Sequence, residues 1–173
     1  MRITACVLVS ICLCTLVQNA SATTWYVATN GNDSAAGTNW ITAKMTIQAG
    51  VDAASAGETV WVTNGLYNTG GRSGFPKGSA LTNRVAINKA ITVRSVNGPQ
   101  ATRIAGQPDP ALTYGRAAVR CVYLTNGAAL IGFTLTNGYT GTGNFTNLGG
   151  GAWCQSSAAV LSNCMLPGNS ADF

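Results

Sequence analysis

The chain of 173 residues has no histidine and only five acidic residues. The lack of histidine excludes nucleophilic catalysis by a serine–histidine–aspartate triad in its usual form, and it removes imidazole as a metal ligand. The five acids are Asp33, Asp52, Glu58, Asp109 and Asp172. Glycoside hydrolysis needs two carboxylates that face one bond, but these acids are scattered and form no D-x-D or D-x-x-D motif. We therefore predict no catalytic residue and no cofactor in this segment.

Metal ligands are scarce for the same reason. The loop N-G-N-D-S places Asp33 beside Asn30 and Asn32, and their oxygen atoms are of the kind that binds calcium. Calcium takes about six to eight oxygen ligands, so a loop with a single carboxylate is more typical of an ordinary turn. No close C-x-x-C pair is present either. The sequence therefore predicts no metal site.

Long apolar runs are absent except at the start of the chain. Arg2 forms a short positive region, residues 3–17 are apolar, and Ala20-Ser21-Ala22 is a cleavage signal of the A-x-A type. This pattern predicts a signal peptide over residues 1–22, cleavage after Ala22, and a secreted or cell-surface protein that starts at residue 23. No later run is long enough for a transmembrane helix, so no transmembrane segment is expected.

Only three cysteines remain after the predicted cleavage, namely Cys121, Cys154 and Cys164. An odd number in an oxidising compartment leaves at least one thiol unpaired. In the repeat described below, Cys154 and Cys164 occupy the places of Tyr123 and Phe133, and cysteine packs well as a small buried hydrophobe. We expect Cys154 and Cys164 to be buried and not bonded to each other.

Charge is sparse and unevenly distributed. Without Arg2 the chain carries nine basic and five acidic residues, a net charge of +4, and residues 121–171 hold no charge at all. One segment with a single acid, Asp109, contains Arg84, Lys89, Arg94, Arg103, Arg116 and Arg120. Such a segment is typical of a solvated outer face, and the alternative is a surface that binds acidic polysaccharide or cell-surface glycans. Nucleic acid is not expected, because the chain is predicted to be exported and its basic residues are not interleaved with aromatic ones.

Aromatic residues are also few, but they include four tryptophans: Trp25, Trp40, Trp61 and Trp153. An exposed indole can stack on a sugar ring. Aromatic residues within strands more often belong to a core or an interface, and this second interpretation is favoured.

The chain contains an internal repeat. Residues 121–138 and 152–169 align without a gap at an offset of 31, so that Leu130 falls on Leu161 and Phe133 on Cys164. The matched positions keep apolar character and small turn residues, as stacked structural units require. Asparagines at equivalent turns are candidates for side-chain ladders, and they are Asn126, Asn137, Asn163 and Asn169.

Local patterns predict mostly strands around one helix. Ile47, Val51 and Ala54 recur at helical spacing after Thr46, a suitable N-cap, and predict a helix over residues 46–56. Strands are expected at 24–29, 59–62, 119–124 and 130–136, and long loops at 66–83 and 106–115. Residues 85–96 read as an earlier rung, aligned at an offset of 40 so that Asn97 falls on Asn137.

Two motifs carry a resemblance to a known superfamily. T-I-Q-A-G-V-D-A-A-S-A-G-E-T-V-W-V-T-N-G-L-Y at residues 46–67 resembles the cap helix and first strand of pectate-lyase-like proteins. L-I-G-F-T-L-T-N-G at 130–138, L-S-N-C-M-L-P-G-N at 161–169 and G-G-G-A-W-C at 149–154 resemble rungs of polymorphic outer-membrane and autotransporter-like surface proteins. The resemblance implies an all-β fold, a right-handed parallel β-helix with a short amino-terminal capping α-helix, of which residues 23–173 are the amino-terminal portion.

The resemblance leaves two functions open, because one fold hosts many activities. The first is a structural, adhesive or carbohydrate-binding protein at or outside the cell surface, which the few acids and the uncharged repeats favour. The second is the amino-terminal part of a polysaccharide-active enzyme whose active site lies on later rungs. In that case Arg94, Arg103, Arg116 or Arg120 would be candidates for a lyase base. An open last rung also predicts self-association, since unpaired strand edges bind other strands.

Overall fold

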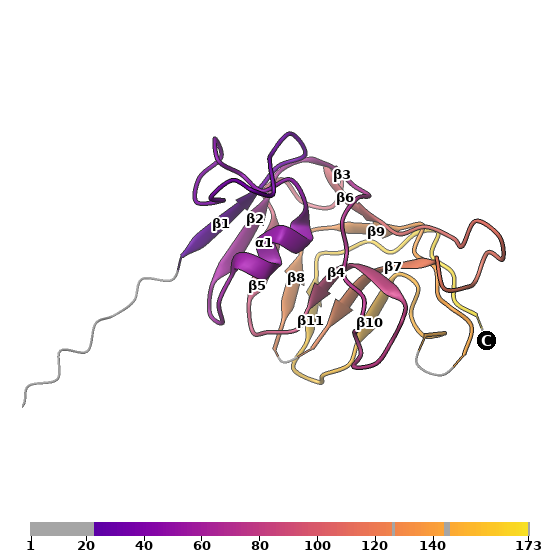
Figure 1. Ribbon diagram of the computed structural model, residues 1–173. Helices are drawn as coiled ribbons and strands as arrows, with labels where there is room; N and C mark the ends of the chain where they lie inside the picture. The colour runs from indigo at the N-terminus through magenta and orange to yellow at the C-terminus, as the bar shows by residue number, and fades with distance from the viewer. Residues whose placement is uncertain (1–22, 126, 144–145, 173) are drawn as a thin grey trace, which may run out of the picture.

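The computed structural model describes residues 23–125, 127–143 and 146–172, and these form a parallel β-solenoid of about four turns. Figure 1 shows three stacked sheets that run side by side along the solenoid. Sheet A has the order β1 (Thr24–Val27), β2 (Thr59–Val62), β5 (Thr92–Ser95), β8 (Ala129–Ile131) and β11 (Val160–Ser162). Sheet B contains β3 (Gly65–Tyr67), β6 (Thr102–Ala105) and β9 (Thr134–Thr136), and sheet C contains β4 (Thr82–Ile87), β7 (Val119–Leu124) and β10 (Ala152–Cys154). Every pairing between these strands is parallel, so the predicted parallel β-helix is confirmed.

The core consists of columns of apolar side chains that point inward from equivalent strand positions. In sheet A one column contains Val60, Val93 and Leu130, all fully buried. Leu130 is paired in register with Leu161 of the next strand, as the repeat predicted. Paired residues of parallel strands point to the same face of a sheet. Each added rung therefore extends a column that its neighbour has begun.

The repeat offset is not constant along a rung. It is 31 residues between β8 and β11 but 30 residues between β7 and β10, because the connection that follows the sheet C strand is one residue longer in the last rung. Consequently Tyr123 is paired with Trp153, and Cys154 is paired with Leu124. The expected match of Tyr123 with Cys154 is therefore wrong.

The earlier rung also has its own spacing. β4 and β5 stand 37 residues before β7 and β8, while β6 stands 31 residues before β9. The expected offset of 40, and with it the match of Asn97 to Asn137, is therefore wrong. Insertions in the turns between sheets change the offset without disturbing strand pairing, since turns lie outside the ladders.

Asparagines support the turns in two different ways. Asn169 donates from Nδ2 to the carbonyl of Leu135 and accepts at Oδ1 from the N–H of Gly138, so it bonds to the backbone of the preceding rung. Asn137 likewise donates to the carbonyl of Gly106. These bonds replace the predicted ladder at Asn137 and Asn169, and Asn126 lies outside the described residues. Asn163 adopts a left-handed backbone with a φ of 49°, which asparagine tolerates better than most residues.

The short helix α1 (Ile47–Ala53) begins where the sequence predicted. The Thr46 hydroxyl accepts a hydrogen bond from the N–H of Ala49 and caps the first turn. The helix packs against β1, β2 and β4, with Ile47 and Val51 buried. It ends at Ala53, earlier than the expected residue 56, because the next residue has an extended backbone.

Helix α1 also closes the edge of sheet C. The Gln48 side chain accepts a 2.8 Å hydrogen bond from the N–H of Ala86 in β4 and donates a 3.4 Å bond to the carbonyl of the same residue. A side-chain amide thus occupies the place that a neighbouring strand would take. Among the described residues, no helix is long and apolar enough to cross a membrane. The predicted signal peptide falls on residues 1–22, outside the described part.

The other edge of the solenoid is exposed. β10 and β11 are edge strands of sheets C and A, and Val160 and Leu166 are about half exposed (47% and 49%). Cys121, Cys154 and Cys164 are free, so the prediction that Cys154 and Cys164 are not bonded is confirmed. The prediction that both are buried is wrong for Cys154, which is exposed, and Cys164 is only half-buried. Both belong to the last described rung, where no following strand covers them.

Candidate functional site

Sheet C carries an outer face that is covered by loops, and this face holds the largest cluster of polar and aromatic side chains. Asn83 of β4 lies beside Arg120 of β7, and Ala86 lies beside Tyr123, which in turn lies beside Trp153 of β10. The loop between β3 and β4 folds over this face, since the Asn83 Nδ2 donates a 2.9 Å hydrogen bond to the carbonyl of Phe75.

Arg120 anchors both loops to sheet C. Its NH1 donates a 2.8 Å hydrogen bond to the Asn83 Oδ1, while NH2 and Nε donate to the carbonyl of Leu148, at 2.7 and 3.1 Å. Its guanidinium carbon also lies 4.9 Å from the centroid of the Trp153 ring, which is a cation–π distance. The side chain is fully buried. Burial lowers the pKa of Arg120 to about 10, so the group stays charged at neutral pH and is held by neutral oxygens.

Arg84 is buried in a similar way near the junction of sheets B and C. Its Nε donates a 2.9 Å hydrogen bond to the carbonyl of Ala105, and its NH1 donates to the carbonyl of Gly70. Burial also lowers the pKa of Arg84. The expectation that the basic segment forms a solvated outer face is therefore wrong for Arg84 and Arg120, which are structural cations. A cation in a strand is buried here because loops, which the strand pattern does not reveal, fold over it.

Aromatic rings continue this face toward the turn after β7. The Phe75 and Tyr123 rings lie 5.7 Å apart, and the Tyr123 and Trp153 rings meet edge to face at 6.0 Å. The Tyr123 hydroxyl donates to the Gln155 Oε1. Tyr123 therefore packs on the outer face under the loop rather than in the inner core that the repeat alignment implied.

Three adjacent hollows lie along the loop that contains Phe75. The first has a volume of about 260 Å³ and is lined by Ala80, Leu81, Gly115, Arg116, Gly141, Thr142 and Thr146. The second has a volume of about 300 Å³, shares Ala80, Thr142 and Thr146 with the first, and adds Lys77, Gly78, Ser79 and Gly143. The third has a volume of about 600 Å³, shares Lys77 with the second, and adds Phe75, Asn88, Tyr123, Thr125, Gln155, Ser156 and Ser157. We call this continuous series of hollows the sheet C groove.

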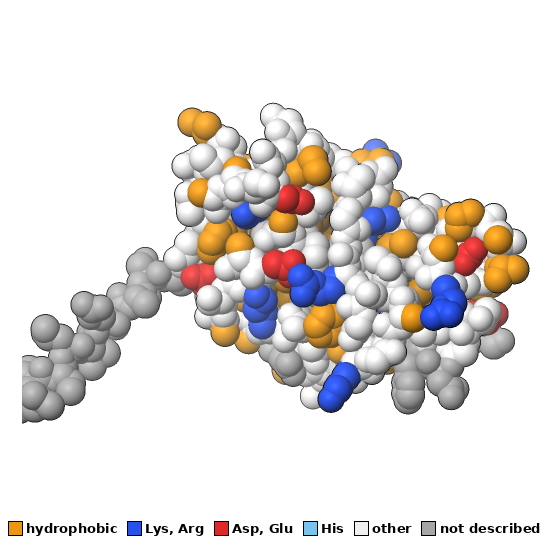
Figure 2. All heavy atoms as spheres, in the orientation of Figure 1, with side chains coloured by type: hydrophobic (Ala, Val, Ile, Leu, Met, Phe, Trp, Pro, Cys, Tyr) orange, Lys and Arg blue, Asp and Glu red, His pale blue; other side chains and the backbone are white. Residues whose placement is uncertain are grey.

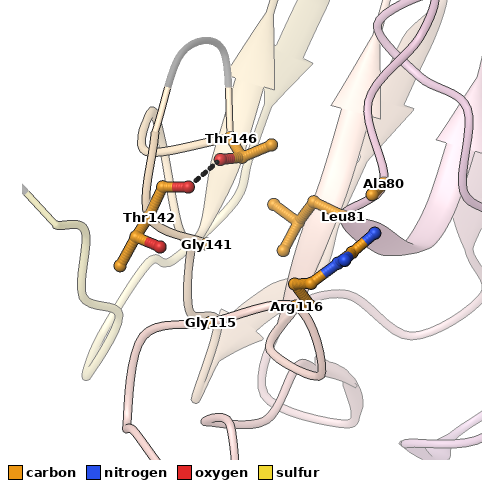
Figure 3. A pocket seen from close by; sticks show the side chains of 7 residues that line it. All are labelled: Ala80, Leu81, Gly115, Arg116, Gly141, Thr142 and Thr146. Atoms are coloured by element: carbon orange, nitrogen blue, oxygen red, sulfur yellow. Dashed lines mark hydrogen bonds between the residues drawn. The ribbon is translucent and has the colours of Figure 1, made fainter.

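Figure 3 shows the first hollow from close by. Thr142 and Thr146 stand on one side, joined by a hydrogen bond from the Thr146 hydroxyl to the Thr142 carbonyl, and Leu81 points toward them from the other side. The Arg116 side chain extends past Leu81 toward Ala80. Its guanidinium is exposed at the rim, since Arg116 is an exposed residue.

The sheet C groove is positive and rich in hydroxyl groups. Arg116 lines its first hollow and Lys77 lines the other two, and both residues are exposed. No acidic residue appears among the described residues that line it. Hydroxyls and amides of this kind bind the hydroxyl groups of a polar ligand, while the two cations favour a negatively charged one.

The other basic residues do not join this groove. Lys89 donates to the carbonyl of Ala54 behind α1, Arg94 lies 4.3 Å from the Trp61 ring on the outer face of sheet A, and Arg103 belongs to β6 of sheet B. Figure 2 shows lysine and arginine side chains at separate places on the face that carries α1. The basic segment is therefore dispersed around the solenoid rather than gathered into one patch.

The acidic residues are engaged in local structure. The Asp33 Oδ1 accepts 2.8 Å hydrogen bonds from the N–H groups of Met45 and Thr46, and its Oδ2 accepts from the Thr46 hydroxyl. Asp33 thus holds the chain just before α1. Asp52 forms a 2.6 Å ion pair with Arg72.

Glu58 and Asp109 also stabilise loops. Hydrogen bonds from the Ser55 N–H and the Trp25 indole, both 2.7 Å, lower the pKa of Glu58. Hydrogen bonds from backbone N–H groups, with that of Ala117 the strongest cause, lower the pKa of Asp109 in the loop before β7. In the described part of the chain, no group of three or more cysteine or acidic side chains is placed to hold a metal ion.

Sequence reasoning found Arg116 and Arg120 but missed the other groove residues. Lys77, Thr142 and Thr146 lie in loops that were expected only to be loops. A usable signal was present, because two Gly-, Ser- and Thr-rich loops each precede a strand of the same sheet, β4 and β10. Loops that enter equivalent strands of a solenoid lie on the same side.

No family model matches this chain, and no curated protein or solved structure matches it either.

Proposed function

We propose that this protein is an exported β-solenoid that binds glycans, with a structural or adhesive role at or outside the cell surface. The observation that carries the proposal is the sheet C groove, in which hydroxyl, amide and aromatic groups line three adjacent hollows. An elongated groove of this kind suits a chain-like ligand better than a compact one. The apolar run and cleavage signal in residues 1–22 support export.

The charge of the groove indicates the class of glycan. Lys77 and Arg116 present two exposed cations, and no acidic side chain lies among the described residues lining the groove to repel an anion. Acidic polysaccharides combine carboxylates with many hydroxyl groups, and both find partners here. Membership of the pectate-lyase-like superfamily belongs to the same proposal, and it is supported by the cap motif and the parallel solenoid.

The test is affinity electrophoresis of the full chain through gels that contain polygalacturonate or alginate. We expect slower migration than in a gel without polysaccharide, and weaker retardation as salt is added, because exposed charges are screened. The double variant Lys77→Ala/Arg116→Ala should lose about tenfold in affinity.

The matched control is Arg103→Ala, which removes one exposed cation from the outer face of sheet B. It should leave the affinity nearly unchanged. If Arg103→Ala weakens binding as much as the double variant, the attraction comes from net charge and not from the groove. Unretarded migration of the parent chain in both gels would refute the proposal.

A polysaccharide-active enzyme is the second candidate. It is favoured by the position of the groove, which lies over a parallel sheet and between loops that enter its strands. Incubation with polygalacturonate, with and without calcium, followed by the absorbance of unsaturated products, separates cleavage from binding alone. Self-association through the exposed edges of β10 and β11 is also part of the adhesive proposal, and sedimentation velocity at rising concentration measures it.

A further inference from the structure

A second hollow lies at the turn between sheets A and B, away from the sheet C groove. It has a volume of about 430 Å³ and is lined by Trp40, Thr63, Asn64, Val96 and Asn97. None of these side chains carries a charge at neutral pH, and none lines the sheet C groove. The hollow is in the size range of small-molecule sites, which combine apolar walls with a few polar groups.

Trp40 provides the apolar wall of this hollow. It is 45% exposed, whereas tryptophan in folded proteins is mostly buried. Its ring meets the Tyr26 ring edge to face, with centroids 4.5 Å apart and planes at 74°. Tyr26 is itself held in β1, paired in register with Trp61 of β2. The indole is therefore held against a rigid sheet while nearly half of it remains open to solvent.

Two asparagine amides provide the polar groups. The Asn97 Nδ2 donates a 2.8 Å hydrogen bond to the Asn64 Oδ1 in the preceding turn, so the two side chains form a short ladder. Both residues are exposed. In the part of the chain that the structure describes, the Asn64 Nδ2 and the Asn97 Oδ1 have no protein partner. One donor and one acceptor are thus free beside the exposed indole.

We propose that this hollow binds a neutral pyranose unit of a polysaccharide. A pyranose has an apolar C–H face that packs on an aromatic ring, and equatorial hydroxyl groups that both donate and accept hydrogen bonds. Trp40 meets the first requirement, and the amides of Asn64 and Asn97 meet the second. The absence of charge among the lining residues favours a neutral sugar over a uronic acid. This proposal rests on residues separate from the sheet C groove and stands without it.

The test uses affinity electrophoresis of the full chain in gels that contain hydroxyethyl cellulose, xylan or galactomannan. We expect retardation by at least one of these neutral polysaccharides. Trp40→Ala should weaken that binding about tenfold or more, as for an aromatic residue at the centre of a contact, and Trp40→Phe should keep much of it. Asn97→Ala should weaken it as well, without removing any aromatic surface.

The matched control is Ile41→Ala, which removes an apolar side chain that is 97% exposed and directly follows Trp40. It should bind as the parent chain does. Lys77→Ala should also leave neutral binding intact while weakening retardation by polygalacturonate, so the two proposed sites can fail separately. The proposal is overturned if none of the three neutral polysaccharides retards the chain, or if Trp40→Ala and Ile41→Ala behave alike.

Discussion

The two edge strands of sheet C differ in what lies beyond them. At β4, the Ala86 N–H and carbonyl bond to the Gln48 side chain, and α1 packs against the strand, so that Ile87 is fully buried. At β10, Cys154 occupies the equivalent inward column, since Ile87 pairs with Leu124 and Leu124 with Cys154. Yet Cys154 is exposed. The same column position is therefore core or surface according to whether another element covers the strand.

Thiol labelling gives the largest expected contrast between the covered and the exposed regions. Cys121 is fully buried in β7, and burial raises its pKa to about 12, so it stays in the unreactive thiol form at pH 8. Partial burial raises the pKa of Cys154 too, but reagent can reach this exposed residue. We expect Cys154 to react at least about a hundredfold faster than Cys121 in the native protein. Mass spectrometry of peptides after timed labelling measures both rates, and equal rates would contradict the difference in burial.

The column of sheet A offers a matched pair of substitutions. Leu130 is fully buried and Leu161, its partner in the last rung, is only half-buried. Leu130→Ala should lower the free energy of unfolding by about 2–5 kcal/mol, because it leaves a cavity in the core. Leu161→Ala should cost about 1 kcal/mol or less, because little buried surface is lost. Urea denaturation of both variants makes the comparison, and similar losses would mean that the last rung is as well covered as the inner one.

The hydrogen bonds from Gln48 give the smallest of these effects. Gln48→Ala leaves the Ala86 N–H and carbonyl without their side-chain partner at a buried edge, so we expect a loss of about 1–3 kcal/mol in the free energy of unfolding. Gln107→Ala, at an exposed position before β7, should cost about 0.5 kcal/mol or less. The same urea experiment measures both. An equal effect of the two substitutions would show that α1 covers β4 without help from this amide.

The sequence predicted the fold through patterns that are local or strictly repeated. The 31-residue repeat placed Leu130 against Leu161, and the spacing of Ile47 and Val51 placed α1 correctly after Thr46. Rung offsets were harder to predict, because one extra residue in a turn changes the alignment of the next strand. For that reason the sequence assigned Cys154 to Tyr123, whereas the structure pairs it with Leu124.

The candidate sites were less predictable than the fold. Arg120 was expected in solvent, and only the loops that fold over sheet C explain its burial against Leu148 and Asn83. Trp40 was grouped with three other tryptophans, but it alone of the four is classed as exposed. Lys77 and Arg116 are 39 residues apart in the chain, and nothing in their local sequence indicates that both line one groove.

The sequence by itself determined the parallel solenoid, its helix, and the scarcity of acidic residues, because periodic apolar residues and composition act locally and repeat in every rung. Only the tertiary structure decided which cations are buried, which thiol is exposed, and which loop residues line the sheet C groove. The physical reason is that burial and proximity depend on what covers each strand from outside. That covering comes from loops of irregular length, whose positions follow from contacts between residues far apart in the chain.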